Sequence, residues 1–253
     1  MITFTARLDR TILIHARPAT VFAFFTSTPD WAAWWGTGST IDARPGGRLL
    51  IRQNGVEVTG EVLEVQAPDR IVFTYGFASG EPIPPGGSQV TIRLDGHPAG
   101  TLLHLTHEFT DVAARDQHVQ GWRYQLSLFA NAVANKVNAG AEATVDRWFG
   151  AWSDPEPSTR NATLDAALAT DIRVADKFSC LAGEADVKPH LAAVHQFMPG
   201  MRLERRGGIR HCQSRVLADW VALGNDGAER GRGTNLFVLD ADGRIAEVVG
   251  FWM

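Results

Sequence analysis

Three side chains in the second half of the chain are of types that move protons near neutral pH. Asp176 ends the stretch 171–176, which alternates in the manner of a strand. His195 lies in a predicted helix, 187–197, and His211 lies near the end of a predicted strand. A carboxylate in an apolar pocket can act as a general base, and a His–Asp pair can pass a proton. We therefore predict Asp176, His195 and His211 as catalytic residues. The alternatives are a turn-capping or solvated aspartate and histidines with purely structural partners.

Aromatic residues are the second group that suggests a site. The chain has 8 tryptophans and 13 phenylalanines against 2 tyrosines. Aromatic walls with a few polar groups are typical of small-molecule sites, although the same rings can simply fill two cores. In the first half the predicted ligand-binding residues are Trp34, Trp35, Phe73, Tyr75, His104 and Trp122. In the second half they are Trp148, Trp152, Trp220 and Asn235, the last as a group that orients a ligand carbonyl.

The elements of the first half predict a sheet covered by one helix. A strand at 3–14 precedes two short helices, a run of about six strands as far as residue 109, and a long helix at 111–137. The long helix repeats apolar residues every three or four positions, which places them on one face. An antiparallel sheet with polar turns buries one face, and this helix is its natural cover. We expect a cavity between the curved sheet and the helix.

The second half begins where this helix breaks. Gly140 favours a helix end, and a new apolar stripe starts at once. We predict two domains, 1–138 and 141–253. The second has helices near 141–152, 161–169 and 187–197, and strands near 171–176, 202–211, 213–223, 231–239 and 245–252. Within strand 213–223, neighbouring residues point to opposite faces, so we expect Trp220 inside and Asp219 outside.

Composition and motifs exclude several classes of function. A net charge of −4 gives no basic surface for nucleic acid. We find no apolar run of membrane-spanning length. The glycines match neither a dinucleotide fingerprint nor a phosphate loop, so we expect no cofactor. His104 and His107 alternate to different faces of one strand, so we expect no metal site. The alternating, charged start of the chain argues against a signal peptide, and we expect a cytoplasmic protein.

The first half resembles a known superfamily. The carrying residues are the Pro-x-x-Val-Phe-x-x-Phe start at 18–25, the tryptophans at 31, 34 and 35, the Gly-Gly-Arg turn at 46–48, and the pair Gly121-Trp122. Residues 1–138 resemble the START-like (SRPBCC) superfamily, in its branch of activator of heat-shock-protein-90 ATPase homologues. The resemblance implies a helix-grip fold and, in many members, an apolar ligand cavity. The branch includes proteins with no known enzymatic step.

The second half resembles another superfamily. The carrying residues are 171–176 after two helices, the helix ending at Pro199-Gly200, and the terminal runs 235–245 and 250–252. Residues 141–253 are similar to SnoaL-like members of the nuclear transport factor two-like superfamily. The resemblance implies a cone-shaped, cystatin-like α+β fold with a pocket at its open end. Its relatives include polyketide cyclases, ketosteroid isomerases, epoxide hydrolases and many non-catalytic binding modules.

Together these observations predict a two-domain α+β protein that binds a small hydrophobic metabolite without a cofactor. Any chemistry is expected in the second domain, as cyclisation, isomerisation or hydrolysis by an acid/base pair. The alternative is a non-catalytic adaptor or chaperone-linked stress protein whose first domain contacts a partner protein. The second resemblance also implies a homodimer.

Overall fold

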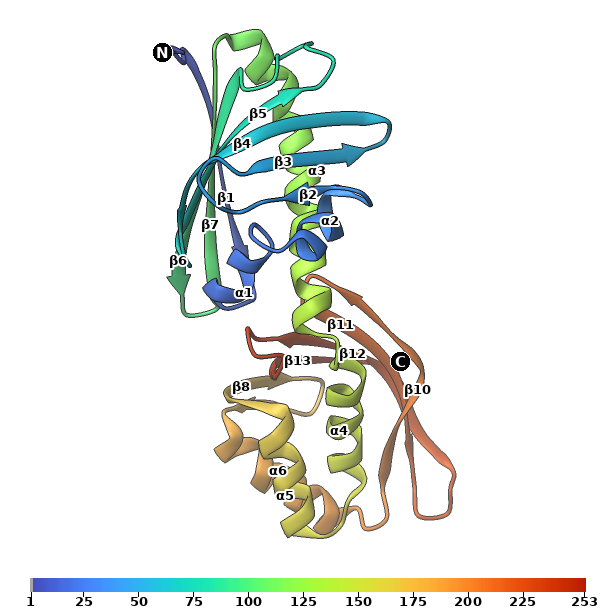
Figure 1. Cartoon of the computed structure of the whole chain (residues 1–253). Coiled ribbons are helices and arrows are strands. Elements are labelled where there is room, and N and C mark those ends of the chain that lie inside the picture. Colours follow the sequence, from blue (N-terminus) through green and yellow to red (C-terminus); the bar gives the residue numbers. More distant parts are fainter. Residues whose placement is uncertain (1) are drawn as a thin grey trace. The chain divides into compact units, whose positions relative to one another are not determined.

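The computed structural model describes residues 2–253 and divides into two compact units. Unit 1 extends to Ala134, and unit 2 comprises Asn135–Met253 (Figure 1). Both units are α+β, as the sequence predicts. The helix α3 (Val112–Val137) begins in unit 1, and α4 (Ala141–Ser153) follows it after a three-residue break. The domain limits of 1–138 and 141–253 stay a prediction, and they coincide with this break.

Unit 1 is an antiparallel sheet with one long helix and two short ones (Figure 1). The strand order is β1-β7-β6-β5-β4-β3-β2. The strands are β1 (Ala6–Ile14), β2 (Thr40–Ile41), β3 (Arg48–Gln53), β4 (Val56–Gln66), β5 (Arg70–Phe77), β6 (Ser88–His97) and β7 (Gly100–Phe109). The short helices α1 (Pro18–Ala23) and α2 (Thr28–Trp35) interrupt the sheet after β1. Two of the expected features are present, the run of strands and the long covering helix.

The apolar stripe of α3 packs against aromatic residues of α2 and of the segment between α1 and α2. The ring of Phe129 stacks on Phe25 at 5.0 Å and meets Trp34 edge-on at 5.0 Å. About two turns earlier, Trp122 meets Trp35 at 5.8 Å. Such edge-to-face and offset contacts add to the stabilisation that burial alone gives. The interior of unit 1 is therefore filled with rings where the sequence predicted a cavity wall.

A chain of hydrogen bonds runs through this interior from α3 to the sheet. The indole Nε1 of Trp122 donates to His107 Nδ1 at 2.9 Å. Because that bond occupies Nδ1 as an acceptor, the ring proton lies on Nε2, which donates to Ser88 Oγ at 2.9 Å. Ser88 Oγ in turn donates to the carbonyl of Tyr75 at 2.8 Å. Burial, reinforced by the neighbouring His118, holds the pKa of His107 well below its ordinary value. His107 is thus a neutral structural link.

Unit 2 packs three helices into a bent sheet with the order β10-β11-β12-β13-β8-β9 (Figure 1). Only the β13–β8 pair is parallel among the described strands of this sheet. Besides α4, the helices are α5 (Pro157–Ala167) and α6 (Glu184–Phe197). The strands are β8 (Leu168–Ala175), β9 (Cys180–Ala182), β10 (Arg202–Cys212), β11 (Arg215–Leu223), β12 (Glu229–Leu239) and β13 (Ile245–Trp252). This is the predicted cone, with β9 as an element that the sequence pattern did not indicate.

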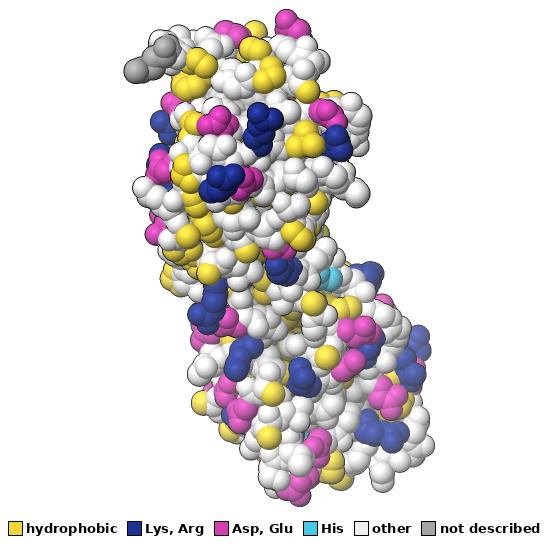
Figure 2. Space-filling model, viewed as in Figure 1, with side chains coloured by type: hydrophobic (Ala, Val, Ile, Leu, Met, Phe, Trp, Pro, Cys, Tyr) yellow, Lys and Arg dark blue, Asp and Glu magenta, His cyan; other side chains and the backbone are white. Residues whose placement is uncertain are grey.

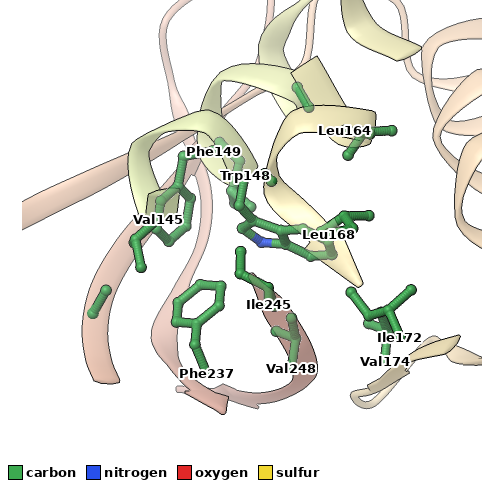
Figure 3. Packing of buried hydrophobic residues seen from close by; sticks show 14 of the residues in the cluster. Val145, Trp148, Phe149, Leu164, Leu168, Ile172, Val174, Phe237, Ile245 and Val248 are labelled. Carbon is green, nitrogen blue, oxygen red and sulfur yellow. The ribbon is translucent and has the colours of Figure 1, made fainter. Parts of the chain in front are cut away.

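The core of unit 2 is centred on Trp148 of α4. Figure 3 shows its indole in the middle of apolar side chains from α5, β8, β12 and β13. Trp148 meets Phe237 edge-on at 6.2 Å, and Phe149 meets the same ring at 6.0 Å. Full burial of a side chain of this size contributes on the order of 2–3 kcal/mol. The core therefore fixes α4 against the sheet and sets the position of the Trp148 ring.

The surface shows mixed charge. On the face drawn in Figure 2, basic and acidic side chains intermingle over both units. Of the helices that the structure describes, none combines the length and the apolar composition that a membrane span requires.

The buried series of hydrogen bonds in unit 1 can be tested by its effect on stability. Replacing Ser88→Ala removes the acceptor for His107 Nε2 and the donor to the Tyr75 carbonyl. Because both groups stay buried without a partner, we expect a loss of roughly 1–3 kcal/mol in the free energy of unfolding, measured by urea titration. The control is Ser79→Ala, whose exposed hydroxyl bonds only to the Glu81 carbonyl. Equal stability of the two variants would show that these hydrogen bonds contribute nothing to the free energy of unfolding.

Candidate functional site

A pocket of about 450 Å³ opens in unit 2 between the helices and the bent sheet. Its wall carries four indoles, from Trp148, Trp152, Trp220 and Trp252. Its polar side chains are Asp176, Ser179, His190, Arg230 and Asn235. The volume lies in the range of small-molecule sites, and so does the combination of an apolar wall with a few polar groups. The predicted residues Asp176, Trp148, Trp152, Trp220 and Asn235 thus come together here.

Two glycines of β12 make room for the indoles in this wall. A Cβ at Gly233 would lie 2.6 Å from the Trp220 ring and 2.1 Å from the backbone oxygen of Phe251. A Cβ at Gly231 would lie 2.8 Å from the Trp252 ring. Both rings therefore lie directly on the backbone of β12, where only glycine leaves space. Trp252 also meets Trp220 edge-on at 4.7 Å, so the two indoles form one corner of the pocket.

Asn235 is oriented by the indole beside it. Trp220 Nε1 donates to Asn235 Oδ1 at 2.8 Å. Because an indole can only donate, this bond identifies the oxygen of the carboxamide and turns Nδ2 away from Trp220. Asn235 is 6% exposed, and no described residue accepts a hydrogen bond from its Nδ2. The amide group is therefore a fixed, unused donor in the wall of an apolar pocket.

Asp176 lies directly after β8, across from Gly250 of β13. Its Oδ1 accepts a hydrogen bond from the backbone of Phe178 at 2.7 Å, and Oδ2 has no hydrogen-bonding partner among the described residues. The Cβ that Gly250 lacks would lie 2.9 Å from Asp176 Cβ, 3.6 Å from its Oδ2, and 3.2 Å from Asn235 Oδ1. Gly250 thus lets a carboxylate and a carboxamide approach one point. Asp176 and Asn235 also line the same pocket, so a base and a hydrogen-bond donor are available to one ligand.

His190 and Ser179 also line the pocket, and the sequence analysis did not select them. His190 Nε2 lies 3.3 Å from Ser179 Oγ, and its ring meets Trp152 edge-on at 5.9 Å. A signal for His190 was available, because it falls on the same helical stripe as Val187 and Val194. Ser179 lies in the turn between β8 and β9, whose pairing has no clear sequence pattern.

His195 was predicted as catalytic, but the structure places it outside the pocket wall. It is five residues after His190, and five residues turn an α-helix by about 140°, so the two rings point apart. The His195 ring bonds to the backbone of Ala151 and lies near Arg160 and Asp154. Burial, with the nearby Arg160, lowers its pKa. Its position supports a structural role at the ends of α4 and α5.

His211 was also predicted as catalytic, and it lies far along β10 from the pocket. The pocket meets β10 at Leu203, and the stretch of β11 that pairs between Leu203 and His211 is six residues, which corresponds to roughly 20 Å of strand. His211 Nδ1 lies 3.2 Å from Asn135 Oδ1, and its Nε2 lies 3.4 Å from Asn138 Nδ2. Burial lowers the pKa of this ring. His211 therefore belongs to a polar cluster around the start of unit 2.

The aromatic candidates of unit 1 share its interior. Trp34, Trp35, Phe73, Trp122 and Tyr75 are all buried, and they pack on one another and on further rings. Burial raises the pKa of the Tyr75 hydroxyl. Their role as ligand contacts stays a prediction. In the structure their rings pack on one another and on neighbouring rings.

His104, the sixth candidate of unit 1, faces the other way. Leu103, Leu105 and His107 are buried, so alternation along β7 turns His104 to the outer face. There its Nε2 lies 3.0 Å from Asp95 Oδ2. His104 lines a polar surface groove of about 360 Å³ instead of the interior. Its phase in the strand, opposite to Leu103 and Leu105, is the signal that indicates this.

Comparison with solved structures finds partial similarities. A member of the SnoaL-like family from Agrobacterium tumefaciens shares 24% identity over 44% of this chain and 95% of its own, with a TM-score of 0.42. CalU16 from Micromonospora echinospora shares 23% identity over 50% of this chain and 74% of its own, with a TM-score of 0.41. The Aha1 dimer from Colwellia psychrerythraea shares 16% identity over 51% of this chain and 96% of its own, with a TM-score of 0.43. At these scores the fold assignment rests on the strand order and helices described above.

Comparison with protein families gives one assignment. No curated protein matches the chain. The family model described as Activator of Hsp90 ATPase homolog 1-like protein matches residues 15–134. This range runs from the end of β1 to the last residue of unit 1. The N-terminal region therefore matches the family that the sequence resemblance predicts, over residues 15–134.

Proposed function

We propose that unit 2 binds a small apolar carbonyl compound and moves a proton on the carbon next to the carbonyl. The observation that carries the proposal is the pairing of Asp176 Oδ2 with the Asn235 carboxamide around Gly250. Both groups line an apolar pocket, and Asp176 Oδ2 and Asn235 Nδ2 have no hydrogen-bonding partner among the described residues. The reaction class is isomerisation or cyclisation through an enolate.

The proposed steps balance within the pocket. Asp176 takes a proton from the α-carbon, and the electron pair moves to the carbonyl oxygen. Asn235 Nδ2 donates a hydrogen bond to that oxygen as its charge grows. If the ligand has a double bond between its β and γ carbons, the proton then returns from Asp176 to the γ-carbon, which is an isomerisation. Alternatively, the enolate carbon attacks a second carbonyl of the same molecule, whose oxygen takes the proton back from Asp176, which is a cyclisation. His190, held by Ser179, is the second group that can carry the proton.

The proposal can be tested without the natural ligand. We use 2-tetralone, a flat ketone with exchangeable α-protons, and follow deuterium uptake from D₂O by NMR. Asp176→Asn removes the base but keeps the shape and the bond from Phe178, so we expect exchange to fall about 10²–10⁴-fold while binding is retained. The matched control is Asp171→Asn, an exposed carboxylate of the same strand, which should exchange like the parent protein. Equal rates in all three proteins would contradict the assignment of Asp176.

The spacing between the two polar groups has its own test. Gly250→Ala places a methyl group 2.9 Å from Asp176 Cβ, which forces the carboxylate to shift. We expect slower exchange together with a loss of roughly 1–3 kcal/mol of stability. Gly208→Ala is the control, because a Cβ there meets nothing within 4 Å. Unchanged exchange in Gly250→Ala would mean that the approach of these groups does not matter.

A second candidate function applies to unit 1. Its aromatic residues pack on one another, as in the filled core expected of a non-catalytic adaptor. We propose that unit 1 serves as a binding or partner-contacting domain, and that chemistry is confined to unit 2.

A homodimer is also part of the proposal. It rests on the resemblance of the second half, and one similar solved structure is described as a dimer. The expected mass by light scattering is twice that of the 27.6 kDa chain. A monomeric mass at working concentration would remove this part of the proposal.

A further inference from the structure

Arg230 lines the pocket of unit 2 because of an irregularity in β12. In the pairing of β11 with β12, Ala222 lies opposite Gly231 while the next residue, Leu223, lies opposite Glu229. Arg230 is therefore an extra residue, as in a β-bulge, and a bulge redirects the side chain that it carries. In a regular strand Arg230 would face away from Gly231, Gly233 and Asn235. The bulge instead brings a guanidinium to the same pocket as Asn235.

The Arg230 side chain has a defined position. A Cβ at Gly224 would lie 2.7 Å from Arg230 Nε and 3.1 Å from Nη2, so the side chain lies folded against this buried glycine. Nη2 donates to Asp226 Oδ2 at 2.6 Å. No described residue accepts a hydrogen bond from Nε or Nη1, so donors remain for a further group. The ion pair with Asp226 is exposed, and exposed pairs contribute little, so it competes weakly with a ligand.

The charged residues of the pocket wall impose an orientation on a ligand. Asp176 supplies the carboxylate and Arg230 the guanidinium of this wall. An anionic group beside Asp176 is repelled, whereas the same group beside Arg230 is attracted. The four indoles of the same wall offer an apolar surface to the body of a ligand. An apolar molecule with one anionic end therefore has one favourable direction of entry.

We propose that the ligand of unit 2 is an amphipathic anion, an apolar ring system or chain with a carboxylate or similar group that Arg230 holds. This inference rests on the proposed function, since it concerns the same pocket. It adds a requirement that the proposed proton transfer does not make, because enolisation by Asp176 and Asn235 needs no anionic group on the ligand. Arg230 is a specificity-determining residue in this account and takes no part in the proton transfer.

Two fluorescent probes separate charge from apolar binding. 8-Anilinonaphthalene-1-sulfonate and N-phenyl-1-naphthylamine share one ring system, and only the first carries an anion. We expect Arg230→Gln to weaken binding of the sulfonate about three- to fivefold, the range of one exposed ion pair, and to leave the neutral probe unchanged. Asp226→Asn, which frees the guanidinium from its ion pair, should strengthen binding of the sulfonate and leave binding of the neutral probe unchanged. Arg232→Gln is the control, an exposed arginine of the same strand paired with Glu229.

The outcomes distinguish this inference from the proposed function. Added salt should weaken binding of the sulfonate to the parent protein more than to Arg230→Gln. If the neutral probe binds and Arg230→Gln changes both probes equally or neither, the anion requirement is wrong and the apolar pocket stands. Ala222→Phe fills the pocket from β11. If the neutral probe does not bind the parent protein, or binds Ala222→Phe equally well, the pocket itself is not a ligand site and both proposals fail.

Discussion

The hydrogen bond from Trp220 Nε1 to Asn235 Oδ1 is the interaction on which the candidate site depends. It joins neighbouring strands β11 and β12, holds the indole flat on Gly233, and leaves the amide donor of Asn235 unused. A carboxamide free to rotate would present either end to a ligand. Because the indole can only donate, the pocket presents a donor, and a donor is what a developing negative charge on a carbonyl oxygen requires.

The two units use aromatic residues in different ways. In unit 1, Trp34, Trp35 and Trp122 pack on one another, and His107 ties the long helix to the sheet as a neutral link. In unit 2, Trp220 and Trp252 line a pocket, and glycines remove the side chains that would otherwise fill it. Glycine in a strand costs stability, since it adds no packing and orders a flexible residue. Its use at three positions around one pocket marks unit 2 as the place where space is kept open.

Periodicity predicted most of the fold. The 3.6-residue stripe of α3 and the strand-and-turn pattern of residues 40–109 were sufficient for the α+β assignment. The same reasoning could have placed two histidines better. His104 is out of phase with Leu103 and Leu105, and His195 is out of phase with the stripe that contains His190.

Other features could not be found in this way. The bulge that turns Arg230 into the pocket depends on a pairing between β11 and β12 that no local pattern encodes. The approach of Asp176 to Asn235 depends on Gly250, which lies on a third strand. His211 was chosen as a strand-end histidine, and only the direction of β10 shows that its end is remote from the pocket. Long-range register, more than residue type, decides which polar groups meet.

The central claim is that ligand binding takes place at Asn235 and Trp220 in unit 2. A ¹H–¹⁵N NMR titration with 2-tetralone tests it directly, because indole and carboxamide groups give separate side-chain signals. We expect shifts in the Trp220 indole and the Asn235 amide, with the Trp34 and Trp122 indoles of unit 1 unchanged. Shifts confined to the unit 1 indoles, or none at saturating ketone, would contradict it.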